Sequence, residues 1–96
     1  MTTLTSDQLR DLSIAVRRAD PDADLYADYS GRGMYGDECV GIVAQDTDQL
    51  MYQLGYDLSG TELGDIIARQ RTDHDSMGLR EIVYFPQLQA PTQENN

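Results

Sequence analysis

The sequence predicts a small α+β domain, in which a three-stranded, mainly antiparallel sheet is packed on one face by two to three helices. Three observations predict this class. Segments with helical periodicity and segments with strand patterns follow one another in the order helix, strand, strand, helix, helix, strand. A glycine-rich stretch, as in hairpin turns, separates the first two strands. The chain of 96 residues has room for one domain and one core.

The first helix has a start signal and an end signal. Thr5 is a favourable N-cap, and Gln8 stands three residues later, as a capping box requires. Pro21 disfavours helical geometry at Asp20, so the helix is expected to end there. The apolar face of this helix consists of Leu9, Leu12, Val16 and Ala19. Residues 1–3, which precede the cap, are expected to fray.

Three segments have the patterns of strands. Residues 24–29 alternate in polarity, which predicts a strand with one wet face. Residues 39–44 are apolar on both sides, which predicts an interior strand. Residues 79–85 form the third predicted strand, and Pro86 ends it. Because so small a sheet leaves its second face exposed, four aromatic residues are candidates to cover that face: Tyr26, Tyr35, Tyr84 and Phe85.

Two further helices are predicted between the second and third strands. Asp46 is a suitable N-cap for the first of them, and Gly60 is a suitable end. Its apolar stripe consists of Leu50, Leu54 and Leu58. Ser59 or Thr61 caps the next helix, whose apolar residues are Leu63, Ile66 and Ile67. Residues 72–78 are interpreted as a polar loop.

Residues 1–86 are predicted to form a single compact domain. Residues 87–96, which are rich in Gln, Asn and Pro, are predicted to form a disordered polar tail. No apolar run approaches the ~18 residues of a membrane span, and no secretory signal is recognisable. A single cysteine, Cys39, leaves no internal disulfide and fits a reducing cytosol. The expectation is therefore a cytoplasmic protein without a membrane partner.

The formal net charge is −10, from 17 acidic residues against 7 Arg and no Lys. So negative a surface repels nucleic-acid backbones and anionic membranes, which predicts no direct nucleic-acid binding. Two interpretations remain for the charge itself. It keeps the protein soluble, or it docks the protein on a basic surface of a partner protein. Self-association as a homodimer stays open.

The stretch at residues 29–36 is the principal candidate site. Its three glycines permit positive φ angles and a close approach of a ligand to the backbone. Successive amide N–H groups can form an anion-binding nest, to which Arg32 adds a forked donor. The spacing matches neither the dinucleotide fingerprint nor the phosphate loop, which requires a Lys. A hairpin turn, a partner-binding loop and a phosphate or nucleotide site are the three interpretations.

No catalytic constellation is evident, so the protein is predicted not to be an enzyme and to need no cofactor. Asp73, His74 and Asp75 suggest a metal site, against the simpler interpretation of a solvated loop. The two acidic residues before Cys39 are expected to raise the pKa of its thiol. Cys39 is therefore interpreted as a small buried residue and not as a nucleophile.

Two motifs stand far apart in the chain: YSGRGMYG at residues 29–36, followed by CVGIV at 39–43, and DSMGLREIVYFP at 75–86. Both resemble segments of small, mostly uncharacterised accessory proteins of bacterial viruses and prophages. The resemblance covers a little under a third of the chain and brings no catalytic residue with it. It implies a context, because such accessory proteins often bind and block a host factor, including components of antiviral defence.

Together, these observations predict a non-enzymatic acidic accessory protein that binds and inhibits or redirects a host protein, with the host cytoplasm as its compartment. A small-ligand protein that holds a phosphate or nucleotide on the glycine-rich loop is the alternative. A metal-dependent hydrolase is the third hypothesis. The predicted partner- or ligand-binding residues are Tyr29, Ser30, Gly31, Arg32, Gly33, Met34, Tyr35, Gly36, Asp75, Met77 and Gly78.

Overall fold

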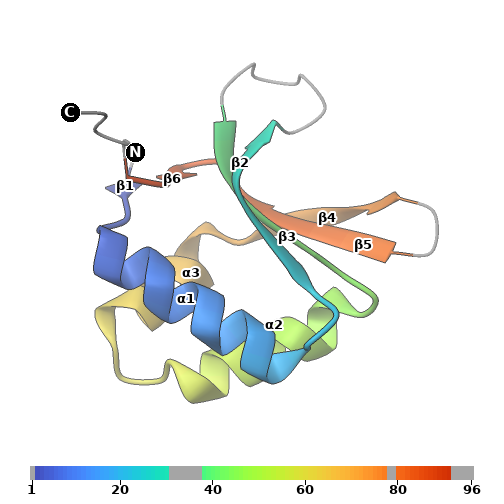
Figure 1. Cartoon of the computed structure of the whole chain (residues 1–96), viewed down its shortest axis with the longest axis horizontal. Coiled ribbons are helices and arrows are strands. Elements are labelled where there is room, and N and C mark those ends of the chain that lie inside the picture. The colour runs from blue at the N-terminus through green and yellow to red at the C-terminus, as the bar shows by residue number, and fades with distance from the viewer. Residues whose placement is uncertain (1, 31–37, 78–79, 92–96) are drawn as a thin grey trace.

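The computed structural model describes residues 2–30, 38–77 and 80–91, with the backbone alone at 28–30, 38 and 72–77 (Figure 1). Within these residues, three helices lie on one face of a four-stranded antiparallel sheet. A short parallel pair of strands joins the two ends of the described chain. The predicted α+β class is confirmed, and all three predicted strands are present as antiparallel neighbours.

The sheet has the strand order β2 (Asp24–Ser30), β3 (Glu38–Ala44), β5 (Arg80–Phe85) and β4 (Thr72–Met77). β3 is therefore an interior strand, as its apolar run predicted. Ile42 of β3 pairs with Leu25 on one side and with Val83 on the other. Residues that pair across strands share one face of a sheet, and this face is buried against the helices.

Helix α1 (Ser6–Ala19) begins and ends where the sequence predicts. The capping box is complete, because Thr5 Oγ1 accepts the Gln8 N–H at 3.0 Å and Gln8 Oε1 accepts the Thr5 N–H at 2.9 Å. The helix ends at Asp20, whose N–H donates to the Val16 carbonyl at 2.9 Å. Its apolar stripe packs into the core.

Two more helices follow, α2 (Thr47–Asp57) and α3 (Glu62–Gln70). Both begin at a side-chain cap: the Asp46 carboxylate accepts the Gln49 N–H and the Thr61 hydroxyl accepts the Gly64 N–H, each at 3.0 Å. Gly60, between the helices, has a φ of 82°. Glycine adopts this left-handed conformation at little cost, so the chain can turn sharply from α2 into α3.

A buried contact ties the start of α2 to the sheet. Thr47, the first residue of α2, is fully buried. Its N–H and its hydroxyl both donate to Glu81 Oε1 of β5, at 3.0 and 3.1 Å. A carboxylate at this position also faces the positive end of the helix dipole. One acidic side chain therefore satisfies two buried donors and holds α2 against β5.

Arg80, the first residue of β5, links β2 and β3 at one end of the sheet. Its Nη1 donates to the Asp24 carboxylate at 3.0 Å. Its Nη2 donates to the carbonyl oxygens of Asp22 at 2.8 Å and of Val43 at 3.2 Å. The rigid fork of donors on a guanidinium suits such bridging. The side chain therefore fixes the start of β2 against the end of β3.

The prediction of a polar loop at residues 72–78 is wrong, because the first six of these residues form β4. Asp75 pairs with Ile82, and Met77 pairs with Arg80, across an antiparallel ladder. The segment lacks the apolar alternation by which strands are recognised, because it lies at the edge of the sheet, where charged residues are common. Pairing with β5 decides its structure, and intrinsic strand preference does not.

The two ends of the described chain meet in a parallel pair, β1 (Thr2–Thr3) and β6 (Leu88–Gln89), which we call the terminal clasp (Figure 1). The Thr2 N–H donates to the Gln87 carbonyl at 2.8 Å, and the Leu4 N–H donates to the Gln89 carbonyl at 2.9 Å. The predicted fraying of residues 1–3 is therefore wrong for β1, and the predicted disorder of residues 87–96 is wrong for β6.

The core lies between the inner face of the sheet and the helices, and the terminal clasp closes one end of it. Leu4 and Leu88, beside and within the clasp, are both buried in this core. The largest core side chain is that of Phe85. The other buried members of the cluster are Leu12, Ala15, Val16, Val40, Ile42, Ala44, Leu50, Met51, Leu54, Leu63, Ile66, Ile67 and Val83.

Candidate functional site

Most of the residues that the sequence predicts as a binding site lie outside the described residues: Gly31, Arg32, Gly33, Met34, Tyr35, Gly36 and Gly78. The other four belong to strands. Tyr29 and Ser30 end β2, and Asp75 and Met77 lie in β4. These four residues can be compared through the pairing of the strands.

The register of the sheet separates these four residues. Ser30 ends β2 at the start of β3, whereas Met77 pairs with Arg80 at the start of β5. Since Glu81 of β5 pairs with Ala44, the last residue of β3, the start of β5 lies at the far end of β3. Tyr29 and Ser30 are therefore at the opposite end of the sheet from Asp75 and Met77 (Figure 1). The strand portions of the two motifs lie side by side, because Val40 of β3 pairs with Phe85 of β5 and Val43 pairs with Ile82.

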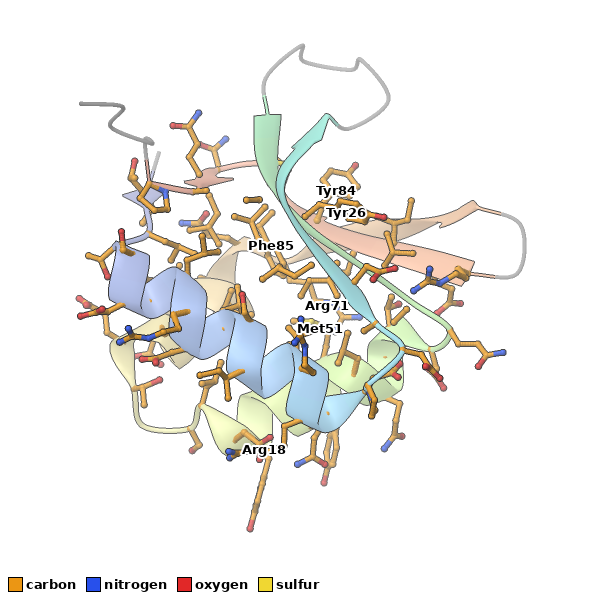
Figure 2. All side chains as sticks on the ribbon, in the orientation of Figure 1. Arg18, Tyr26, Met51, Arg71, Tyr84 and Phe85 are labelled. Atoms are coloured by element: carbon orange, nitrogen blue, oxygen red, sulfur yellow. The ribbon has the colours of Figure 1, made fainter. Side chains whose placement is uncertain are left out.

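The face of the sheet that is turned away from the helices presents Tyr26 and Tyr84, two of the four aromatic residues predicted there (Figure 2). They stand on either side of Gly41 in the register. Phe85, also predicted for this face, is instead fully buried in the core. The reason is the alternation of β5, which places neighbouring residues on opposite faces. Tyr35 is not among the described residues.

Cys39 is buried, as predicted. Burial raises the pKa of its thiol above the ordinary value, and a backbone hydrogen bond at Phe85 partly opposes this rise. The direction agrees with the prediction, and the largest cause is desolvation by burial. The side chains of the two preceding acidic residues lie outside those that the structure describes. A buried neutral thiol is a weak nucleophile.

The hypothetical metal site at Asp73, His74 and Asp75 falls in β4, where the backbone alone is described. In the part of the chain whose side chains are described, no group of three or more His, Cys, Asp and Glu residues is arranged to hold a metal ion.

The exposed side of the helical layer presents the clearest candidate surface. Tyr52 and Tyr56 of α2 stand one helical turn apart and are 75% and 76% exposed. Ile14 of α1 is 48% exposed. Together with Asp57 and Leu58 at the end of α2, Ile14 lines a shallow depression of about 130 Å³. We call Ile14, Tyr52 and Tyr56 the helix surface. Large exposed apolar and aromatic side chains are candidates for contact with a partner.

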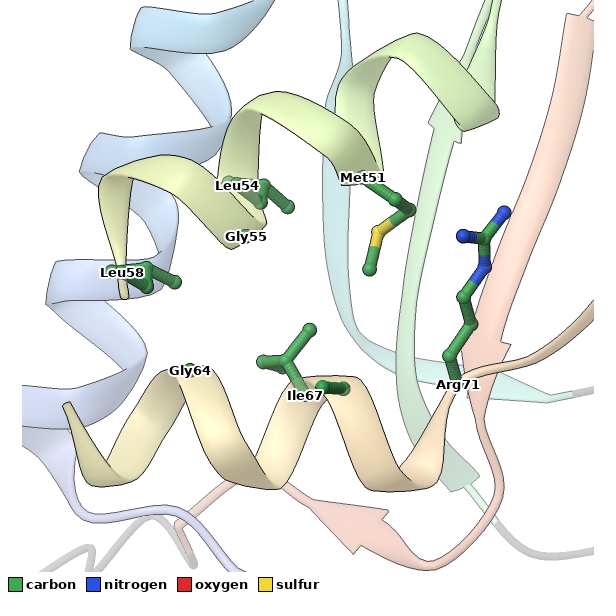
Figure 3. Close-up of a pocket in the computed structure, with 8 residues that line it drawn as sticks. Met51, Leu54, Gly55, Leu58, Gly64, Ile67 and Arg71 are labelled. Atoms are coloured by element: carbon green, nitrogen blue, oxygen red, sulfur yellow. The ribbon is translucent and has the colours of Figure 1, made fainter. Parts of the chain in front are cut away.

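A groove lies between α2 and α3 (Figure 3). Its volume is about 210 Å³. Ile67 of α3 points into it from one side, and Met51 and Leu54 line the other. Arg71 extends across one end towards Met51. The remaining lining residues are Gly55, Leu58, Gly64 and Ala68.

Two glycines shape this groove in different ways. A Cβ added at Gly64 would overlap the carbonyl oxygen of Leu58, so α3 approaches the end of α2 closely only because Gly64 has no side chain. A Cβ added at Gly55 would have no atom within 4 Å. The helices therefore touch at Gly64 and leave free space at Gly55.

One charged residue, Arg71, lines the groove. Its Nη2 donates a hydrogen bond to the Asp48 carboxylate at 2.7 Å, which closes one end of the groove with an ion pair. Two acidic residues near the helix ends instead contact the α1 side: Asp57 lines the depression beside Ile14, and Glu62 Oε1 accepts a hydrogen bond from Gln8 Nε2 at 3.4 Å. The groove itself is therefore mainly apolar.

The sequence of α2 contains a pattern that indicates the helix surface. The stripe Leu50, Leu54 and Leu58 defines the buried side of α2, so the two tyrosines that lie outside the stripe are turned to solvent. A spacing of four places both aromatic rings on the same side of the helix. The groove itself depends on how α2 and α3 pack, which no local pattern specifies.

Comparisons of the chain with protein-family models, with curated proteins and with solved structures found no match. Among the helices described, none has the length and apolar character needed to cross a bilayer. The resemblance of residues 29–43 and 75–86 to accessory proteins of bacterial viruses stays a prediction.

Proposed function

We propose that the protein is a non-enzymatic interaction protein, which docks on a basic surface of a host protein and inhibits or redirects that protein. The observation that carries the proposal is the helix surface. Three of the four large hydrophobic side chains that are exposed within the described residues, Ile14, Tyr52 and Tyr56, belong to it. Tyrosine is favoured in interfaces because it offers rigid apolar area and a polar tip.

Charge supports the choice of a basic partner. The net charge of −10 attracts a positively charged surface over a distance and speeds association at low salt. The acidic residues Asp11 and Asp57 line the depression beside Ile14, and Arg18 is the basic residue there. The host context comes from the resemblance to accessory proteins of bacterial viruses and prophages, and antiviral defence is one such context.

Affinity capture with matched variants tests the proposal. The purified 96-residue chain is immobilised and exposed to bacterial host lysate, and bound proteins are identified by mass spectrometry. We expect a specific bound protein that the double variant Tyr52→Ala, Tyr56→Ala loses. The variant Tyr52→Phe, Tyr56→Phe keeps the aromatic area and should retain most of the binding. Thermal unfolding of each variant controls for folding.

The predicted hairpin site is tested in the same assay. If the double variant Arg32→Ala, Tyr35→Ala loses the bound protein while the alanine variants of Tyr52 and Tyr56 keep it, the contact surface is residues 29–36 and not the helix surface. If no variant at either surface changes the set of bound proteins, the proposed function is wrong.

A further inference from the structure

We propose that the groove between α2 and α3 binds a small monocarboxylate with an apolar body, such as an arylalkanoate. The apolar body lies on the floor of the groove, and the carboxylate contacts Arg71 at its end. This ligand site is separate from the helix surface and does not depend on the proposed function. It follows from the lining, the volume and the charge of the groove.

The floor of the groove suits an apolar guest. Met51, Leu54 and Ile67 line it, and all three side chains are buried. Ile67 points into the groove from α3 (Figure 3). Gly55 of α2 leaves space for the guest, because a Cβ added there would have no atom within 4 Å. An apolar group that enters this space is removed from water, which favours binding.

The volume of the groove, about 210 Å³, limits the size of this guest. An apolar cavity of about 150 Å³ is large enough to bind benzene. The α2–α3 groove therefore accommodates a benzene-sized ring with a short arm. Pockets for drug-sized ligands usually have volumes of about 300–1,000 Å³, so a larger ligand is not expected to fit.

The charge of the groove calls for an anionic group at one end. Among the described residues that line the groove, only Arg71 is charged, and Figure 3 shows its side chain across one end. A guanidinium has five N–H donors, and the described hydrogen bond of Arg71 uses one of them, on Nη2. The planar fork of donors matches the two oxygens of a carboxylate, which it binds through parallel hydrogen bonds. A ligand on the apolar floor therefore gains most from a carboxylate at the end of a short arm.

Asp48 competes with such a ligand for Arg71. Its carboxylate lies 2.7 Å from Arg71 Nη2, but its side chain is 76% exposed, compared with 35% for Arg71. Ion pairs between exposed side chains are weak, because water solvates both partners. The ligand carboxylate, in contrast, is held beside the guanidinium by the burial of its apolar body. Removal of the Asp48 charge should therefore strengthen binding, whereas removal of the Arg71 charge should weaken it.

The experiment titrates phenylpropanoate into the ¹⁵N-labelled 96-residue chain and follows amide chemical shifts. Phenylpropanamide, which has the same ring and arm but no charge, is the matched control ligand. Phenylpropanoate should shift the amides along the groove, at residues 51–58 and 64–71, with a dissociation constant in the millimolar range that is usual for so small a ligand. Phenylpropanamide should bind about tenfold more weakly, because it lacks the charge-assisted hydrogen bonds.

Two arginine variants and one aspartate variant test the contact with the carboxylate. Arg71→Gln should weaken binding of phenylpropanoate by about tenfold or more. Arg69→Gln removes the same charge from an exposed position of α3 that does not line the groove, and it should leave binding unchanged. Asp48→Asn removes the competing carboxylate and should strengthen binding by about two- to fivefold. Dispersion of the amide spectrum shows whether each variant is folded.

A second pair of variants tests the position of the apolar body. Gly55→Leu places a side chain in the free space of the groove and should weaken binding by about tenfold or more. Gln49→Leu places the same side chain on an exposed position of α2 outside the groove and should leave binding unchanged.

Other outcomes overturn the proposal in distinct ways. Shifts confined to other elements, or equal binding by Gly55→Leu and Gln49→Leu, would exclude the groove. Equal binding of phenylpropanoate and phenylpropanamide, or of Arg71→Gln and Arg69→Gln, would refute a carboxylate site at Arg71. No shift at the groove with about 20 mM phenylpropanoate would exclude a ligand of this class. Each of these results leaves the proposed function to the capture assay, which tests the helix surface.

Discussion

Two glycines that line the same groove differ in what a methyl group would meet. At Gly64 the added Cβ would overlap the Leu58 carbonyl oxygen, which is backbone and cannot rotate away. Gly64→Ala is therefore expected to lower the free energy of unfolding by roughly 1–3 kcal/mol. Gly55→Ala meets nothing and should raise it by about 0.5–1 kcal/mol, because alanine favours helix. Urea unfolding of both variants measures the sign of the change in the free energy of unfolding at each position. A similar change at both positions would contradict the close packing of α3 on Leu58.

Cys39 gives the protein a pH-dependent stability in the alkaline range. Its pKa is raised in the folded state by burial, so the folded state holds the thiol proton more tightly than the unfolded state. The resulting contribution to stability is complete below the ordinary thiol pKa and is lost as the pH rises through the raised value. Urea unfolding of wild type and Cys39→Ala across this range measures the effect. The free energy of unfolding of the wild type should fall relative to that of Cys39→Ala as the pH rises. A constant difference would contradict a raised pKa.

At the residue scale, sequence reasoning worked where the signal is local. The capping partners Thr5 and Gln8 and the burial of Cys39 were predictable, because each depends on neighbours in the chain. The placement of Phe85 in the core was missed, although the alternation with Tyr84 was available in the sequence. The register of β5 decides whether Tyr84 or Phe85 points towards the helices, and the partner strand sets this register.

Among the elements, α2 depends on β5, because Glu81 of β5 accepts hydrogen bonds from the buried donors of Thr47, the first residue of α2. Glu81→Ala removes the acceptor of the buried Thr47 N–H and hydroxyl and is expected to cost about 1–3 kcal/mol of unfolding free energy. Glu81→Gln keeps an acceptor oxygen and should cost less. Urea unfolding of both variants, with Thr47→Val in combination, measures the coupling. No loss in Glu81→Ala would show that the contact contributes nothing to stability.

The helices were more predictable than the strands, for a physical reason. Helix caps and stripes are contacts within a few residues, so α1, α2 and α3 could be placed from Thr5, Asp46 and Thr61. β4 and the terminal clasp are held by pairing with distant segments. Their sequences need only tolerate an edge position, so they lack a pattern of their own. The α2–α3 groove could not be predicted from the sequence either, because it forms only when the two helices pack against each other.

For the whole molecule, the net charge of −10 predicts a salt response. Self-repulsion of like charges destabilises a compact state, and the described ion pairs at Asp7, Asp48 and Asp24 are largely exposed and therefore weak. Raising NaCl from about 0.1 M to about 1 M shortens the Debye length from about 10 Å to about 3 Å. We expect the urea midpoint to rise over this range. A fall would mean that attractive ion pairs outweigh the repulsion.

The terminal clasp makes the two ends of the described chain open together. The amide protons of Thr2 and Leu4 are bonded to Gln87 and Gln89, so neither end can leave without exposing the other. In hydrogen exchange, these two amides should therefore exchange at rates that follow a single local opening, well ahead of the amide of Ile42 in the interior strand β3. Leu88→Ala, which removes buried contacts of the clasp, should accelerate exchange at Thr2 and Leu4 together. The first and last strands are thus one unit of cooperative opening, although more than eighty residues of chain separate them.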